Sequence, residues 1–194
     1  MSYDHKAARI KEYLFNNSDE IEIVDGTKEY ERTPDSMTTT ARTAYDDIIR
    51  AVEVKPAVDW IIHDGLGTLH EICEMTMRQE FKLKPFEGIR ERTVWKYRRV
   101  LLANVHRKSL ECAIKGVVYT TFVGYEDMEV EDGEVITRRM APKYFDAIEE
   151  ETDTVFLTSI KDTKEGSKFL VKVITSKVPK WKTGEIKDVT ITLP

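Results

Sequence analysis

The fold of this chain is decided by residues 59–69, which read DWIIHDGLGTL. The run before Asp64 is mostly apolar on both faces, as expected for a strand buried between layers of helices. Gly65 and Gly67 separate this strand from a helical pattern that begins near Leu69. An acidic residue in this position lies at the carboxyl end of a parallel strand, where open α/β sheets bind their ligands. Asp64 is therefore the first candidate site residue.

The rest of the chain alternates between strand and helix patterns. Strands are predicted at 21–24, 58–63, 117–121, 154–160, 168–175 and 187–193, and a hairpin at 128–136 around Asp132-Gly133. Helices are predicted at 6–15, from Thr40 or Thr43 to Pro56, around 69–77, from about 94 to 115 and at 143–150, with irregular structure at 27–39 and 80–90. This order predicts an α/β fold, a mostly parallel sheet flanked by helices, with antiparallel strands at the C-terminal end.

Composition narrows the class of protein. The 194 residues carry 30 basic and 35 acidic side chains, a net charge of −5, which suits one globular domain and gives no global argument for nucleic-acid binding. Cys73 and Cys112 lie in apolar helical patterns, which favours buried thiols in a reducing compartment over a disulfide or a zinc site. With no long apolar run, the expectation is a soluble, cytoplasmic protein without a membrane partner.

The order of motifs from residue 41 to 194 resembles the RecA/RadA group of ATPases, especially the RecA-like ATPases of phage recombination systems. The strand that ends at Asp64 resembles the Walker B strand, and the later segments 115–121 (KGVVYTT), 140–143 (MAPK), 151–155 (ETDTV) and 176–180 (SKVPK) follow in the order of that family. The resemblance implies that Asp64 orients a metal ion at the nucleotide and that Thr121 is a polar sensor near the γ-phosphate. Phe122 departs from the family pattern, which puts intact catalysis in doubt.

The phosphate-binding loop of that family is missing from the sequence. No G-x-x-x-x-G-K-[ST] occurs, because Gly166-Ser167-Lys168 lacks the first glycine and the final hydroxyl. One Asp cannot replace the backbone amides and the lysine that hold the phosphates. Autonomous ATP hydrolysis is therefore not expected, and Mg-ATP is expected as a cofactor only if another chain supplies the loop.

Relative to the family, the first strand, which lies inside the sheet, has no counterpart before residue 21. Three explanations follow: a truncated or split gene product, a degenerate and non-hydrolysing relative, or residues 1–20 that refill the sheet in a new way. An exposed sheet edge demands pairing, so a homo-oligomer or a partner chain is expected to cover it. A simpler alternative is that a helix over residues 6–15 caps the edge.

Positive charge is concentrated between residues 76 and 108, which hold ten Lys or Arg and three acidic residues, a balance of +7. Aromatic residues such as Trp95 and Tyr97 are interleaved with these cations, a pattern typical of single-stranded DNA binding. The candidate DNA contacts are Lys82, Lys84, Arg90, Arg92, Lys96, Arg98 and Arg99. The alternative is a solvated helix face with both aromatic side chains turned into the core.

Two later segments carry opposite charge, the first acidic and the second basic. Residues 126–134 hold six acidic side chains, which argues against a RecA-style DNA groove there and suits a basic partner or a solvated hairpin. Lys177, Lys180 and Lys182 surround Trp181. The family resemblance implies that Lys177 and Lys180 reach a nucleotide of a neighbouring subunit.

Other kinds of chemistry are poorly supported. The four histidines do not form a metal-binding spacing, and Asp25, Asp59, Asp64 and Glu71 would suit a metal nuclease only if the fold gathered them. The expected function is a degenerate or partner-completed RecA-like protein of viral or phage DNA recombination or replication, which binds DNA or a recombination partner. The alternatives are a structural oligomerisation module that binds neither nucleotide nor DNA, and an ATPase subunit completed by another chain.

Overall fold

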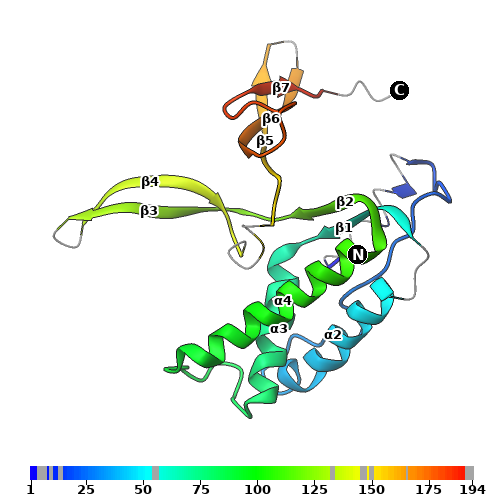
Figure 1. Cartoon of the computed structure of the whole chain (residues 1–194), viewed down its shortest axis with the longest axis vertical. Helices are drawn as coiled ribbons and strands as arrows, with labels where there is room; N and C mark the ends of the chain where they lie inside the picture. The colour runs from blue at the N-terminus through cyan, green and yellow to red at the C-terminus, as the bar shows by residue number, and fades with distance from the viewer. Residues whose placement is uncertain are drawn as a thin grey trace. The chain divides into compact units, whose positions relative to one another are not determined.

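The computed structural model describes residues 1–3, 8, 11–12, 15–53, 57–131, 134–144, 148, 151–164 and 166–190, with the side chains of 125–140 excluded. Within this range the chain divides into two compact units, Met1–Ile148 and Glu149–Pro194 (Figure 1). The expectation of a single domain over the whole chain stays a prediction.

Three helices form the helical layer of the first unit: α2 (Met37–Glu53), α3 (Leu66–Glu80) and α4 (Arg92–Cys112). They lie side by side in Figure 1 and contact one another in every pairing. Apolar side chains recur every three or four residues along each helix, so one stripe of each faces the others. This core includes Ala44 and Ile48 of α2, Leu69 and Ile72 of α3, and Leu102 of α4, all fully buried.

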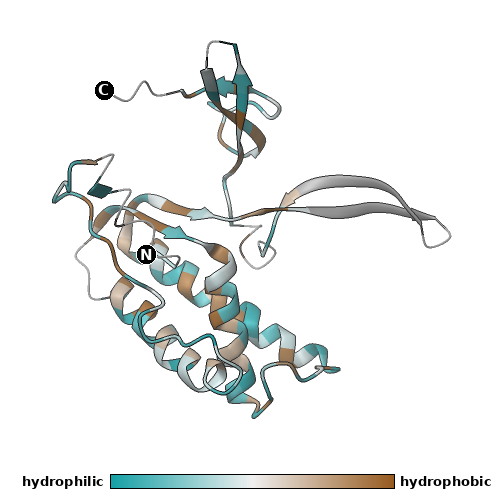
Figure 2. Cartoon of the chain, turned by 180° about the vertical axis from the view of Figure 1, so that it is seen from behind, coloured by the Kyte–Doolittle hydropathy of each residue, from teal (hydrophilic) through white to brown (hydrophobic). Residues whose placement is uncertain are grey.

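A pair of parallel strands lies against this helical layer. β1 (Val58–Asp64) and β2 (Ala113–Thr120) pair in parallel, with Asp64 opposite Thr120. His63 is buried and stacks on Tyr119 of β2, while Trp60 and Ile62 point to the opposite face and are exposed. Hydrophobic residues occur along both strands (Figure 2). Those on the helical side are covered, whereas Trp60 and Ile62 on the other side are exposed.

The first three residues pair with the free side of β1. The Asp64 N–H donates to the Met1 carbonyl at 3.0 Å, and the Tyr3 N–H donates to the Asp64 carbonyl at 3.1 Å. Ser2 also bridges to Asp25, and a Cβ on Gly26 would overlap the Tyr3 ring, so glycine is required at position 26. Residues from the N-terminal segment thus supply pairing to β1, as one of the three explanations requires, but the described pairing involves only residues 1–3.

The remaining strands are antiparallel. β3 (Val123–Glu131) and β4 (Glu134–Pro142) form a hairpin whose expected turn, Asp132-Gly133, lies outside the described residues. The second unit contains β5 (Thr154–Thr163), β6 (Gly166–Ser176) and β7 (Ile186–Asp188), in that order across one antiparallel sheet. A mixed α/β fold with antiparallel C-terminal strands is confirmed, although the parallel pairing of named strands is limited to β1 and β2 among the described residues.

Several expected elements differ in the structure. Residues 21–24 do not form a strand, because Val24 only accepts one hydrogen bond from Ser2 before the single bridge at Asp25. The long helix ends at Cys112, three residues early, since the chain turns extended at Ala113 to pair with β1. Of the expected helix at 143–150, Lys143 and Tyr144 form a turn and most of the rest lies outside the described residues.

Of the expected helix at 6–15, the described residues are Ala8, Lys11, Glu12 and Phe15, and all four are helical.

Cys73 and Cys112 are free, as expected. Cys73 is buried, which raises the pKa of its thiol to about 12, and Cys112 is half-buried. In the described part of the chain, no helix is both long and apolar enough to cross a membrane.

Candidate functional site

Asp64 lies at the carboxyl end of β1, where the sequence placed it, and its closest side-chain partner comes from β2. The Thr120 hydroxyl donates to Asp64 Oδ1 at 2.6 Å and accepts the Gly65 N–H at 2.9 Å. Gly65 has a φ of 103°, a left-handed conformation that suits glycine, and it starts α3 directly after the strand. One Asp64 oxygen is therefore held by a neighbouring strand.

Thr121, the expected sensor, lies elsewhere. Its hydroxyl donates to the Lys143 carbonyl at 2.8 Å, and no contact with Asp64 is among its described hydrogen bonds. Successive residues of a strand point to opposite faces, so only one of the two threonines can face Asp64. The register Asp64↔Thr120 selects Thr120, which the sequence alone does not indicate because register depends on pairing between distant segments.

The groups at Asp64 do not fit a magnesium nucleotide by themselves. Asp64 and Thr120 offer one carboxylate and one hydroxyl, and the sequence contains no phosphate-binding loop. No cluster of three or more His, Cys, Asp or Glu side chains suited to a metal ion occurs among the residues that the structure describes.

A buried hydrogen-bond chain connects the N-terminal residues, β1 and α4. The Ser109 hydroxyl donates to the Val105 carbonyl at 2.8 Å, so its single proton is already used. His63 Nε2 lies 2.8 Å from Ser109 Oγ and must therefore donate to it. In the neutral ring Nδ1 then accepts from the Tyr3 hydroxyl, also at 2.8 Å. The chain Tyr3–His63–Ser109 is fully satisfied.

This trio contains the residue types of a nucleophilic site but not its chemistry. A serine nucleophile must donate its proton to the histidine, whereas Ser109 donates to a backbone carbonyl. Ser109 and His63 are completely buried and Tyr3 is almost so, which leaves no room for a substrate. The role of the trio is to fasten residues 1–3 and β1 to α4.

The buried histidine predicts a pH-dependent stability. Burial lowers the pKa of His63 from 6.5 to about 3, and the N-terminal amine and His106 add to this effect. Between these two values the unfolded chain binds a proton that the folded protein does not, so the free energy of unfolding falls as pH falls, by roughly 1 kcal/mol per pH unit. Above pH 6.5 this contribution is fully present.

Urea unfolding at about pH 7 and about pH 5 measures this effect, with His63→Gln as the control. The glutamine side chain can donate and accept without titrating, so the variant should be less stable at neutral pH but lose less stability on acidification. Equal pH dependence in the two proteins would contradict the assignment to His63.

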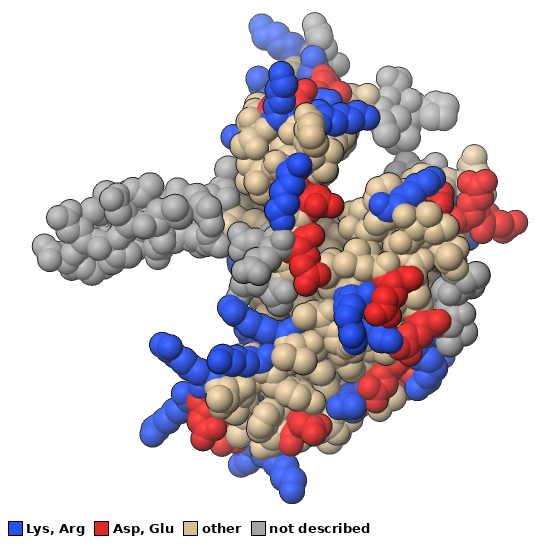
Figure 3. All heavy atoms as spheres, in the orientation of Figure 1, with Lys and Arg blue, Asp and Glu red and all other residues tan. Residues whose placement is uncertain are grey.

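The expected DNA-binding residues of α4 separate into two groups in the structure. Arg92, Lys96 and Arg99 are exposed and follow one another at intervals of four and three residues, so they share one face of the helix. With Trp95 and Arg98 they line a hollow of about 380 Å³. Lys and Arg side chains gather around this part of the molecule in Figure 3. We call Arg92, Lys96 and Arg99 the α4 basic face.

Arg98 and Arg78 belong to a structural network around Glu74 of α3. Arg78 and Arg98 form ion pairs with opposite oxygens of Glu74 at 2.9 Å and 3.2 Å, and the Arg78 side chain is only 7% exposed. The Arg98 guanidinium also lies 4.8 Å from the centre of the Trp95 ring. Both arginines are thus occupied by neighbours within the fold, and Trp95 is half-buried against the core.

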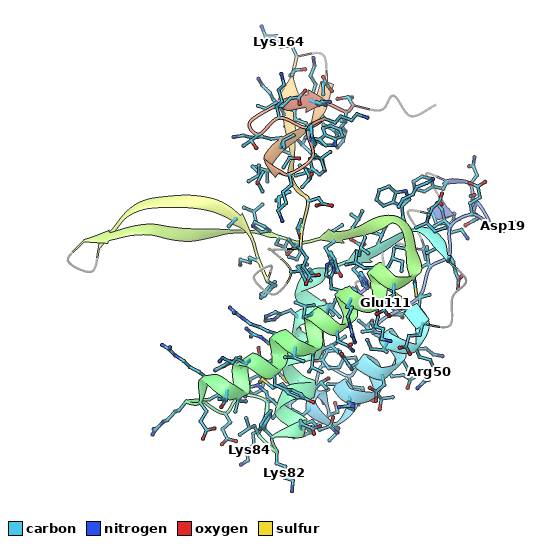
Figure 4. All side chains as sticks on the ribbon, viewed as in Figure 1. Asp19, Arg50, Lys82, Lys84, Glu111 and Lys164 are labelled. Atoms are coloured by element: carbon cyan, nitrogen blue, oxygen red, sulfur yellow. The ribbon has the colours of Figure 1, made fainter. Side chains whose placement is uncertain are left out.

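Lys82, Lys84 and Arg90 lie on the irregular segment between α3 and α4, as expected, and are exposed. Figure 4 shows Lys82 and Lys84 pointing outward from this segment. The segment is fixed to α3 because Arg78 donates to the carbonyls of Lys84 and Glu87 at 3.1 Å and 2.8 Å. Arg78 thus anchors this segment at Lys84 and Glu87, and the three cations are exposed along it.

Lys177 and Lys180, the residues expected at a neighbouring nucleotide, both belong to the second unit. The Lys177 N–H donates to the Asp153 carbonyl at 2.7 Å, and Lys180 Nζ lies 5.8 Å from the centre of the Trp181 ring. The acidic side chains of the β3–β4 hairpin lie outside the described residues.

Comparison of the chain with protein-family models, curated proteins and solved structures gave no match.

Proposed function

We propose that this chain is a RecA-like protein that does not hydrolyse ATP by itself and that binds single-stranded DNA through the α4 basic face. The observation that carries the proposal is the alignment of Arg92, Lys96 and Arg99 on one exposed side of α4, around a hollow that Trp95 also lines. Asp64 at a strand end, followed by Gly65 and α3, supports the RecA-like ancestry.

Charge and rigidity favour DNA as the ligand of this face. Residues 76–108 carry a balance of +7 in a chain whose net charge is −5, so the positive charge is local. Acidic residues outside this range offset part of it, because Glu74 pairs with Arg78 and Arg98. Three cations along two turns of one helix can follow successive phosphates of a backbone. The ion pairs of Glu74 hold α4 against α3. Because the helix is already fixed, DNA binding requires little loss of conformational entropy in the backbone that carries these cations.

The test is the double variant Lys96→Ala/Arg99→Ala, measured by fluorescence anisotropy with a labelled oligothymidylate at several salt concentrations. Loss of two phosphate contacts should weaken binding about tenfold or more at low salt and reduce the slope of log affinity against log salt by roughly 1.4. Circular dichroism should be unchanged, because both side chains are exposed.

The matched control is Lys28→Ala/Arg50→Ala, which removes the same charge from two exposed positions outside α4. This control should bind DNA almost as the unaltered protein does. If both double variants lose affinity equally, the effect is one of net charge and the α4 basic face is not the site.

One observation favours a second candidate function, a structural oligomerisation module. The outer face of the β1–β2 pair exposes Trp60, Ile62, Ile114 and Val118 together. Contiguous apolar residues on a sheet face mark protein interaction surfaces. This candidate gains weight if the Lys96→Ala/Arg99→Ala protein binds the oligothymidylate as the unaltered protein does.

A further inference from the structure

The sheet of the second unit has one face with exposed aromatic side chains. Residues that pair directly across antiparallel strands share a face, and the register pairs Phe156 with Val173 and Ile160 with Phe169. Phe156, Ile160 and Phe169 are 44%, 64% and 47% exposed. We call these three side chains the β5–β6 aromatic face.

Trp181 closes one end of this face. Its ring meets Phe156 edge to face, with 5.4 Å between ring centres, and Val173 next to Phe156 is fully buried. Lys187 Nζ lies 4.2 Å from the centre of the Trp181 ring and Lys180 Nζ 5.8 Å from it. The Trp181 ring is thus engaged by its neighbours, whereas Phe169 at the other end remains open.

The second unit carries an excess of positive charge, and part of it lies near the aromatic rings. Residues 154–190 contain eight lysines and four acidic residues, a balance of +4 against −5 for the whole chain. The register places Lys161, Lys168 and Lys172 on the opposite face of the sheet and Asp162 on the aromatic face. Lys187 pairs with Val171 on β6, which places it on the aromatic face between the positions of Phe156 and Phe169. Glu185 lies 3.6 Å from Lys187 and offsets part of its charge. For Lys180 and Lys182, no ion pair exists within the described part of the chain.

We propose that the β5–β6 aromatic face is a second binding site, for single-stranded nucleic acid, in which bases stack on Phe169 and Phe156 and lysines contact the phosphates. Four residues of strand separate Phe156 from the pair Ile160↔Phe169, about 13 Å, so the two rings would hold bases a few nucleotides apart. Exposed aromatic rings beside cations are the combination that binds single strands without sequence preference. A purely apolar partner would offer no charge complementary to the local excess of lysine.

This site does not depend on the proposed role of α4, because it uses only residues of the second unit. Its test separates ring stacking from apolar contact at one position. Phe169→Leu keeps an apolar side chain but removes the ring, and Phe169→Tyr keeps the ring. Since Phe169 is exposed at the open end, neither variant should disturb the Trp181 cluster.

The probe is a fluorescein-labelled oligothymidylate of about 16 nucleotides, read by anisotropy with the full-length chain. We expect Phe169→Leu to weaken binding roughly tenfold, whereas Phe169→Tyr should bind with nearly the affinity of the unaltered protein. Lys180→Gln should weaken binding less and make it less dependent on salt, as the loss of one phosphate contact does.

The same measurements in the Lys96→Ala/Arg99→Ala background distinguish the two sites, because a loss caused by Phe169→Leu there cannot come from α4. Equal affinities of Phe169→Leu and the unaltered protein, in either background, would overturn the proposal. Equal weakening by Phe169→Leu and Phe169→Tyr would also overturn it, since the ring itself would then not matter.

Discussion

Replacement of Tyr3 by alanine should lower the free energy of unfolding by about 4 kcal/mol, the typical cost of removing a large aromatic side chain from a core. Tyr3 is 2% exposed, its hydroxyl lies 2.8 Å from His63 Nδ1, and its backbone pairs with Asp64. Loss of the ring removes both the packing against Gly26 and the hydrogen bond that satisfies His63. Urea unfolding monitored by circular dichroism measures the change.

Tyr3→Phe is the matched control, because it removes only the hydroxyl. It should cost about 1–2 kcal/mol, the penalty for a buried acceptor left without its donor. Hydrogen exchange adds a local readout: in Tyr3→Ala the Asp64 amide, which donates to the Met1 carbonyl, should exchange much faster. Equal stability of Tyr3→Ala and Tyr3→Phe would show that residues 1–3 do not pack on β1 as described.

Replacement of Glu74 by alanine should cost about 3 kcal/mol. Its carboxylate joins Arg78 and Arg98, whose side chains are 7% and 19% exposed, so the variant leaves two largely buried guanidinium groups without their counter-charge. Removing one partner of a buried ion pair is strongly destabilising for this reason. Thermal or urea unfolding would record the loss.

Two further variants show whether the charge is responsible. Glu74→Gln keeps the shape and some hydrogen bonding but not the charge, and it should be nearly as destabilising as Glu74→Ala. Arg98→Ala should be destabilising as well, in contrast to Lys96→Ala on the exposed side of the same helix. If Arg98→Ala and Lys96→Ala have the same small effect, Arg98 is not part of a structural network.

The sequence was sufficient for elements that carry their own local pattern. β1 is a mostly apolar run that ends in Asp64-Gly65, and the stripe of α2 follows from Ala44, Ile48 and Val52. The start of β2 has no local signal, because Ala113-Ile114-Lys115 contains no residue that ends a helix. Pairing with β1 makes the chain extended there. Residues 1–3 are too few to show any period.

The candidate site was predictable in position but not in detail. Asp64 could be placed because strand ends are local features, whereas the choice of Thr120 over Thr121 depends on the register between strands whose paired residues are about 56 positions apart. Likewise, ten cations between residues 76 and 108 look alike in sequence. The ion pair with Glu74, on a different helix, identifies Arg98 as structural, whereas Lys96 and Arg99 are exposed.

The pairing of residues 1–3 with β1 has a consequence for how the first unit folds. Tyr3 meets His63 across 60 residues of chain, and β2 meets β1 only after α3 and α4 have been made. Contacts of such long range raise the contact order and slow folding, because a large loop must close before they form. Residues 1–3 are synthesised before β1, with which they pair. Because this pairing is long-range, we expect the helical layer to assemble first and the sheet last.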